Sequence, residues 1–108
     1  MKITGHKMDP KLKQQWLVAL RSGNYQQCQT VYKNNELKAP AFCCIGVLMD
    51  LKKPGVDPYS WSSDMSGFFT AQFGPVLREK GTPYQVLVKM NDSGHSFSEI
   101  ADWIEENL

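Results

Sequence analysis

The sequence predicts an α+β protein in which helices dominate: a small single domain over residues 1–108 with about four helices and one short β-hairpin. Three observations lead to this prediction. A chain of 108 residues can bury one hydrophobic core but not two. Apolar residues recur at helical spacing in several segments, whereas strand-like composition is confined to residues 28–42. Hydrophobic residues make up 42% and charged residues 21%, which excludes a disordered chain.

A first helix is predicted over about residues 10–21. Asp9 offers a side chain for the N-cap, and Pro10 suits the first helical position because its missing N–H is not needed there. Gly23 can end the helix. The apolar residues at helical spacing are Leu12, Trp16 and Leu20.

A β-hairpin is predicted over about residues 28–42. Residues 29–33 are rich in β-branched and aromatic types, the two asparagines at 34 and 35 have turn chemistry, and residues 37–42 would form the returning strand. Pro40 lacks an N–H, so it confines the second strand to an edge of the sheet or stands at the end of that strand.

A buried helix is predicted over about residues 43–52, because this segment is apolar almost all round. Gly46 weakens such a helix by about 1 kcal/mol relative to alanine. We therefore expect a neighbouring element to approach the helix closely at Gly46.

Residues 54–81 lack a sustained period and are rich in glycine, proline and aromatic residues. We interpret them as ordered loop with short helical pieces, because so many aromatic side chains would be costly to expose. Burial in the domain's own core is the first expectation for the following aromatics, the last of which lies on the C-terminal helix: Tyr59, Trp61, Phe68, Phe69 and Trp103.

A pair of helices is predicted over about residues 83–108. Thr82 and Gln85 have the spacing of a capping box, although a strand over residues 84–90 stays open because apolar residues also alternate there. A turn at residues 91–94 separates this element from the last helix. Ser96 and Glu99 form a second capping box, and the following residues are strongly amphipathic.

Charge is unevenly distributed around a formal net charge of +1. Residues 1–38 carry seven Lys and Arg against two Asp and Glu, and residues 81–108 carry one against five. We interpret the basic and acidic helices as solvated faces that could be neighbours in the fold. The acidic C-terminal segment also leaves no room for a recognition helix, which argues against sequence-specific DNA binding.

The sequence predicts a cytoplasmic protein. The first residues have scattered lysines and do not resemble a secretory signal. The longest apolar run, residues 41–49, is far shorter than the roughly 20 residues that cross a bilayer, so we expect no membrane association. Three cysteines, two of them adjacent, suit reduced thiols better than a disulfide framework.

Two adjacent cysteines at a predicted helix start are the main candidates for catalysis. Cys43 or Cys44 could be a nucleophile if His95 lies near, with Asn91 or Asp92 orienting the imidazole. Buried structural thiols are the favoured interpretation, because the segment is apolar. The spacing of cysteine and histidine does not fit a zinc site, and phosphate-binding glycine motifs are absent, so we expect neither a metal nor a cofactor.

Three blocks of sequence resemble a family of small phage and prophage proteins. The blocks are LRSGNY at residues 20–25, FCCIGVLMDL at 42–51 and MNDSGHSFSEIAD at 90–102. They resemble that family's LRSGxY, FCCLGVLxDL and C-terminal LNDxGxSFxEIAxxIE patterns, with Ile45 and Met90 standing where the patterns have leucine. The resemblance implies a phage accessory gene without an assigned activity. His95 falls at a variable position of the pattern, so the resemblance adds nothing to a Cys–His pair.

Our leading hypothesis is a non-enzymatic phage protein that binds a host component and neutralises or redirects it, as in counter-defence or host takeover. The partner would be a host protein or a small nucleotide signal. Tyr59 or Trp61 would stack on a nucleotide, and Trp103 could anchor a protein partner. The candidate phosphate contacts are Arg21, Lys33 and Arg78.

The alternative function is a cysteine-dependent hydrolase or transferase that uses Cys43 or Cys44. Rapid alkylation of one of these thiols near neutral pH would favour it. The sequence leaves open whether the chain forms homo-oligomers.

Overall fold

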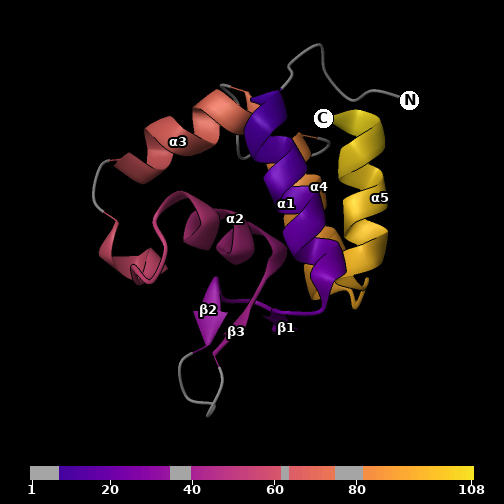
Figure 1. Cartoon of the computed structure of the whole chain (residues 1–108), viewed down its shortest axis with the longest axis horizontal. Coiled ribbons are helices and arrows are strands. Elements are labelled where there is room, and N and C mark those ends of the chain that lie inside the picture. Colours follow the sequence, from indigo (N-terminus) through magenta and orange to yellow (C-terminus); the bar gives the residue numbers. More distant parts are fainter. Residues whose placement is uncertain (1–7, 35–39, 62–63, 75–81) are drawn as a thin grey trace.

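The chain forms five α-helices, one short 3₁₀ helix and a three-stranded sheet within residues 8–34, 40–61, 64–74 and 82–108, the parts that the computed structural model describes (Figure 1). The helix-dominated α+β fold class is confirmed, with five helices where about four were predicted. The elements are α1 (Pro10–Ser22), β1 (Gln26–Gln27), β2 (Lys33–Asn34), β3 (Ala41–Phe42), α2 (Cys44–Lys52), η1 (Pro58–Ser60), α3 (Asp64–Phe73), α4 (Pro83–Asp92) and α5 (Phe97–Asn107).

Helix α1 has the ends that its sequence predicts. The Asp9 side chain accepts the Lys11 N–H at 3.2 Å, and Gly23 leaves the helix in the left-handed conformation, with φ of 80°. The helix ends one residue later than expected, at Ser22. Its inner face buries four apolar residues, Leu12, Trp16, Leu17 and Leu20. These side chains attach α1 to the common core.

Helices α1 and α5 lie side by side and run in opposite directions (Figure 1). The Arg21 guanidinium on α1 contacts Asp102 at 2.8 Å and Glu105 at 3.1 Å on α5. The predicted Ser96–Glu99 capping box begins α5, with bonds of 2.9 and 3.1 Å. The expectation that the basic and acidic helices are neighbours is therefore confirmed.

Helix α2 is the buried helix, as predicted. All six residues from Cys44 to Met49 are buried, and Cys43 is its N-cap rather than its first residue. A β-carbon added at Gly46 would lie 1.9 Å from the carbonyl oxygen of Tyr32. The close approach expected at Gly46 is therefore real, and it is made by the backbone that leads into β2.

The small sheet has the order β1-β3-β2, with β3 in the centre. Strands β2 and β3 pair antiparallel, so the hairpin is confirmed, although each strand has only two residues and residues 35–39 lie outside the described part. Strand β1 pairs parallel with β3 and was not expected. Strand β3 begins directly after Pro40, so the proline stands at the strand's end, and the edge position is wrong.

The aromatic-rich segment is more helical than the sequence suggested. Within residues 54–81, η1 is a short piece as expected, but α3 is a regular helix of ten residues. Trp61 and Phe69 are buried, whereas Phe68 and, on α5, Trp103 are partly buried. Tyr59 is 56% exposed, so its expected burial is wrong. Residues 62–63 and 75–81 lie outside the described part.

Helix α4 decides the open choice over residues 84–90: the strand alternative is wrong. Leu87 and Asn91, four residues apart, lie on the same face of this helix, and both are fully buried. Thr82 is the N-cap, but its side chain makes no capping bond, so the first predicted capping box does not form. The helix continues through Asp92 into the predicted turn, which is reduced to residues 93–94.

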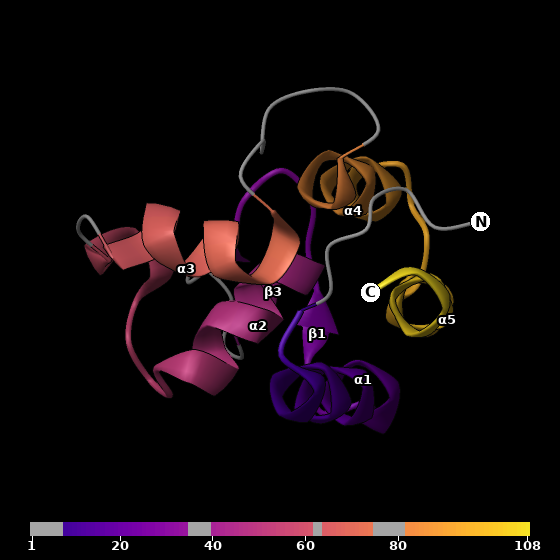
Figure 2. The same ribbon diagram turned by 90° about the horizontal axis from the view of Figure 1, so that it is seen from above.

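Seen from above, α1, α5, α4 and α3 lie around α2 (Figure 2). Helix α2 contacts both α1 and α4, and α4 contacts α3 and α5. None of the helices in the described ranges combines the length and the apolarity that crossing a membrane requires. The gap between α2 and α4 is where the candidate site is found.

Candidate functional site: a tyrosine-lined pocket

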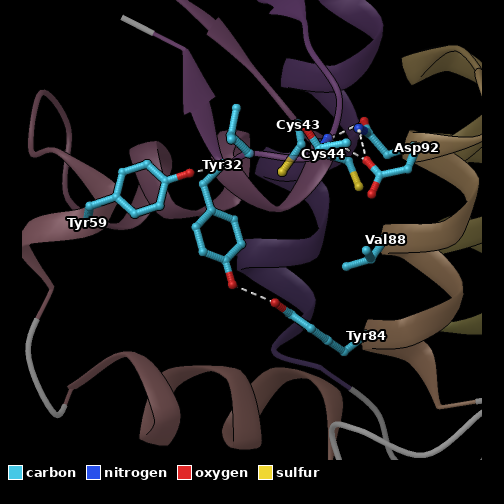
Figure 3. Close-up of a pocket in the computed structure, with 10 residues that line it drawn as sticks. Tyr32, Cys43, Cys44, Tyr59, Tyr84, Val88 and Asp92 are labelled. Carbon is cyan, nitrogen blue, oxygen red and sulfur yellow. Dashed lines mark hydrogen bonds between the residues drawn. The ribbon is translucent and has the colours of Figure 1, made fainter.

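A pocket of about 260 Å³ opens where the N-terminus of α2, the loop before β2, η1 and α4 meet (Figure 3). Its wall combines aromatic, thiol and polar side chains from parts of the chain far apart in sequence. The lining residues are Thr30, Val31, Tyr32, Cys43, Cys44, Tyr59, Tyr84, Val88, Asn91 and Asp92.

Three tyrosines form a connected part of this wall. The hydroxyls of Tyr32 and Tyr84 are 2.5 Å apart, and the Tyr59 hydroxyl accepts the backbone N–H of Tyr32 at 2.9 Å. The Tyr32 and Tyr59 ring centroids are 5.7 Å apart, and Phe69 supports Tyr84 from behind at 5.2 Å. Burial, followed by the bond to Tyr32, raises the pKa of Tyr84 well above its ordinary value. Its hydroxyl therefore stays protonated and neutral.

Asn91 fixes the position of α4 against the rest of the pocket. Its side chain is fully buried, and its Oδ1 accepts the backbone N–H of Cys44 at 3.1 Å and the side-chain amide of Gln27 at 3.0 Å. Its Nδ2 donates to the carbonyl of Cys28 at 2.8 Å. One side chain on α4 is thus bonded to the start of α2 and to the chain that follows β1.

Asp92 holds a strained loop at the rim. Thr30 has φ of 69°, a conformation that is unfavourable for a β-branched residue. Its backbone N–H donates to Asp92 Oδ1 at 2.8 Å, and the Asn91 amide reaches the same oxygen at 3.4 Å. Asp92 is the one charged residue in the wall that the structure describes.

The two cysteines are held as structural groups. Cys43 Sγ accepts the Gly46 N–H at 3.3 Å as the cap of α2, and Cys44 donates its S–H to the carbonyl of Leu87 at 3.6 Å. Burial raises the pKa of Cys43 to about 11 and raises that of Cys44 well above its ordinary value. Neither thiol is therefore an activated nucleophile.

His95 is not brought to the cysteines. It is exposed, its Nδ1 lies 3.8 Å from Glu99 Oε2 on α5, and it does not line the pocket. The side chains of Asn91 and Asp92, which were expected to orient it, are bonded to the start of α2 and to the loop before β2. The arrangement needed for a cysteine–histidine pair is absent from the described residues.

Comparison with known proteins gives one match. The model of a family described as a domain of unknown function, DUF8296, matches residues 8–73, more than half of the chain. The chain belongs to this family. No curated protein and no solved structure matches it significantly.

The DUF8296 match ends with α3, so α4 and α5 lie outside the matched residues. Tyr84, Val88, Asn91 and Asp92 of the pocket all come from α4. Six of the ten lining residues therefore come from the DUF8296 segment, and four come from the helix α4 that lies beyond it.

The other predicted binding residues are not gathered at the pocket. Arg21 forms its ion pairs with α5. The Lys33 Nζ lies 5.3 Å from the centroid of the Phe42 ring. Trp61 is buried, and the Lys53 Nζ lies 4.6 Å from the centroid of its ring. Trp103 lies on α5, away from the pocket lining. Arg78 lies outside the described residues.

Tyr59 is thus the one predicted ligand contact that the structure places in the pocket. Sequence reasoning missed Tyr32 and Tyr84 as site residues. A signal for Tyr84 exists, because Tyr84, Val88 and Asn91 share one face of a helix at i, i+4 and i+7 spacing. No comparable signal marks Tyr32, which lies in a loop.

A second hollow, wider and more open, lies over α1 and the end of α2, with a volume of about 710 Å³. Val18, 58% exposed, and Leu51 supply its apolar surface, and Lys11, Gln14 and Gln15 surround them. It has no converging set of bonded polar groups, so the tyrosine-lined pocket is the better candidate. Within the described ranges, no three His, Cys, Asp or Glu side chains gather closely enough to hold a metal ion.

Proposed function

We propose that this protein is a non-enzymatic binding protein, and that its tyrosine-lined pocket takes a small ligand or one side chain of a partner. In this proposal a phage or prophage encodes it, and in the host cytoplasm it neutralises or redirects a host component. The observation that supports the proposal is the preorganised wall of the pocket. Hydrogen bonds hold Tyr32, Tyr84 and Asn91 in place before any ligand binds. The three sequence blocks support the phage origin.

The chemistry of the thiols favours binding over catalysis. A cysteine hydrolase needs a thiolate and a nearby base. Here burial raises the pKa of Cys43 to about 11, and His95 faces Glu99 instead of a thiol. With no activated nucleophile in the described wall, occupation of the pocket is the simpler function.

Size and charge make a nucleotide a weaker candidate ligand than the sequence suggested. Drug-sized ligands fill roughly 300–1,000 Å³, and this pocket has about 260 Å³. Two of the three candidate phosphate contacts, Arg21 and Lys33, are engaged elsewhere, and the described wall carries a carboxylate instead. The pocket is therefore better suited to a smaller group.

Native mass spectrometry of the full chain, purified gently from phage-infected bacteria, tests the binding function. We expect a stoichiometric adduct on the wild type that is lost in Val88→Phe, which fills the pocket from α4. Val18→Phe makes the same change on the exposed face of α1 and should keep the adduct. Melting curves of both variants establish that they are folded. An adduct that survives Val88→Phe would contradict the assignment to this pocket.

Alkylation with iodoacetamide separates binding from the enzymatic alternative. A thiol with a pKa of about 11 is only about 0.1% thiolate at pH 8, about a hundredfold less than a thiol with a pKa of 9. We expect the partly exposed Cys28 to react first, with Cys43 and Cys44 protected until denaturant is added. Rapid labelling of Cys43 or Cys44 in the folded protein would contradict the proposal.

A further inference from the structure

The pocket wall has an electrostatic character of its own. Asp92 is negatively charged, and the lining residues in the described part include no lysine or arginine. The two lysines nearest to aromatic rings, Lys33 and Lys53, lie over Phe42 and Trp61, neither of which lines the pocket. The one charged side chain in the described wall is therefore a carboxylate, which attracts a cation and repels an anion.

The tyrosines add a second attraction for positive charge. Figure 3 shows Tyr59 and Tyr32 on one side of the pocket, with Tyr84, Val88 and Asp92 on α4 at the other side. The face of an aromatic ring carries partial negative charge and attracts ammonium and guanidinium groups. Because the three hydroxyls bond within the wall, the rings keep their positions when a ligand binds.

The carboxylate is also held in place before binding. Both described hydrogen bonds to Asp92 end on Oδ1, from the Thr30 N–H at 2.8 Å and the Asn91 amide at 3.4 Å. Oδ2 is the oxygen that we expect to meet a ligand. The strained φ of Thr30 persists only because the surrounding contacts hold it, as is common at binding sites.

We propose that the pocket recognises an organic cation, an alkylammonium or guanidinium group, held between the tyrosine rings and the Asp92 carboxylate. This inference rests on the proposed binding function and names its ligand class. A volume of about 260 Å³ suits one such group with its short alkyl chain. The group could belong to a free organic cation or to a lysine or arginine side chain of a partner.

Titration of the ¹⁵N-labelled full chain, followed by NMR, tests the ligand class with three probes. Butylammonium is the cation, 1-butanol is its neutral counterpart of similar size, and adenosine monophosphate is the anion. We expect butylammonium to give saturable shifts at residues 30–32, 43–44 and 84–92, and to bind at least ten times more tightly than 1-butanol.

Matched variants assign the affinity to the carboxylate and the rings. Asp92→Asn keeps an oxygen for the Thr30 N–H but removes the charge, and we expect about tenfold weaker binding of butylammonium. Asp102→Asn makes the same charge change on α5 and should stay within about twofold, because Asp102 is exposed and does not line the pocket. Tyr59→Leu should weaken binding about two- to fivefold, and Tyr59→Phe, which keeps the ring but loses the bond to the Tyr32 N–H, should weaken it less.

Two further probes distinguish the sources of the cation. Putrescine represents a free organic cation, and acetyl-Gly-Lys-Gly-amide represents a side chain on a partner. Tighter binding of putrescine supports a free ligand, and tighter binding of the peptide supports a protein partner.

The outcomes separate this inference from the proposed function. Chemical-shift changes at the pocket residues with 1-butanol or adenosine monophosphate, but not with butylammonium, would contradict the assignment of a cationic ligand. They would still support a binding pocket. Unchanged butylammonium affinity in Asp92→Asn would likewise contradict the cationic ligand. If none of the probes shifts residues that line the pocket, the proposed binding function itself is contradicted.

Discussion

Replacement of Gly46 by alanine tests how closely the chain before β2 crosses α2. In a free helix this change would stabilise by about 1 kcal/mol. Here the new β-carbon would lie 1.9 Å from the Tyr32 carbonyl oxygen, about 1.5 Å closer than the 3.4 Å at which ordinary contact begins. The oxygen belongs to the backbone, and the backbone also fixes the position of the β-carbon, so no side-chain rotation can relieve the clash.

The required shift also strains the bond from the Cys43 N–H to the same Tyr32 oxygen, now 3.1 Å. Overpacking of about 1–3 kcal/mol and a weakened hydrogen bond of about 1 kcal/mol exceed the gain in helix propensity. We expect Gly46→Ala to lower the free energy of unfolding by about 1–3 kcal/mol, measured by urea denaturation.

Gly67 in α3 is the matched control. A β-carbon there meets nothing within 4 Å, so Gly67→Ala should raise the free energy of unfolding by up to about 1 kcal/mol. The two variants should therefore change stability in opposite directions. A Gly46→Ala protein as stable as the wild type, or more so, would refute the close crossing. Because Tyr32 lines the pocket, Gly46→Ala should also weaken the binding of any ligand found there.

Three further predictions concern the hydrophobic core, the hydrogen bonds of Asn91 and the response of stability to alkaline pH. Ile104→Ala should lower the free energy of unfolding by about 2–5 kcal/mol because the side chain is fully buried. Glu105→Ala, on the exposed face of the same helix, should lower it by at most about 1 kcal/mol. Similar losses for the two variants in urea denaturation would contradict the packing of α5. Asn91→Ala should lower the free energy of unfolding by at least about 3 kcal/mol, because it leaves the backbone N–H of Cys44 and the carbonyl of Cys28 without this partner. A loss below about 1 kcal/mol would show that these hydrogen bonds contribute little to stability. Burial and the bond to Asp50 raise the pKa of Tyr25 from 10.0 to about 12, so the protonated phenol stabilises the fold below pH 10 and this stability is lost as pH rises to 12. The stability difference between wild type and Tyr25→Phe should therefore be constant below pH 10 and shrink between pH 10 and 12, and a difference that grows there would reverse the sign of the argument.

Local chemistry allowed the helices at both ends of the chain to be predicted well. Asp9 and Gly23 mark the ends of α1, and the Ser96–Glu99 capping box marks the start of α5, because each acts on backbone groups only a few residues away. The buried character of α2 and the close approach at Gly46 were also visible, since an all-round apolar helix must be covered on every side.

The elements that were missed depend on distant partners. Strand β1 consists of two exposed glutamines, Gln26 and Gln27, and becomes a strand only because β3 pairs with it. Helix α3 has Met65, Phe69 and Phe73 at helical spacing, but the glycines, serines and prolines around them favoured a loop in the sequence. Asn91 reads as a turn residue in the sequence, yet in the fold its amide meets backbone groups more than 40 residues away.

The pocket could not have been assembled from sequence for the same reason. Tyr32 and Tyr84 are 52 residues apart and share a hydrogen bond only after α4 has docked. Tyr59 was singled out as a stacking residue, but nothing in its neighbours indicated which rings would stand beside it. Arg21 was proposed as a phosphate contact because of its charge, and its pairing with α5 depends on a packing that spacing alone does not encode.

Helix α4 contributes both to the packing of the fold and to the wall of the pocket. Asn91 hydrogen-bonds this helix to the segment that the family model matches, and Tyr84 and Val88, one turn apart, line the pocket. A change at Val88 therefore alters the pocket wall without removing a hydrogen bond, whereas a change at Asn91, which also lines the pocket, removes bonds that hold α4 in place. A ligand that bridges both sides acts as a clamp, and at a hundred times its Kd it would add about 2.7 kcal/mol to the docking of α4 and α5.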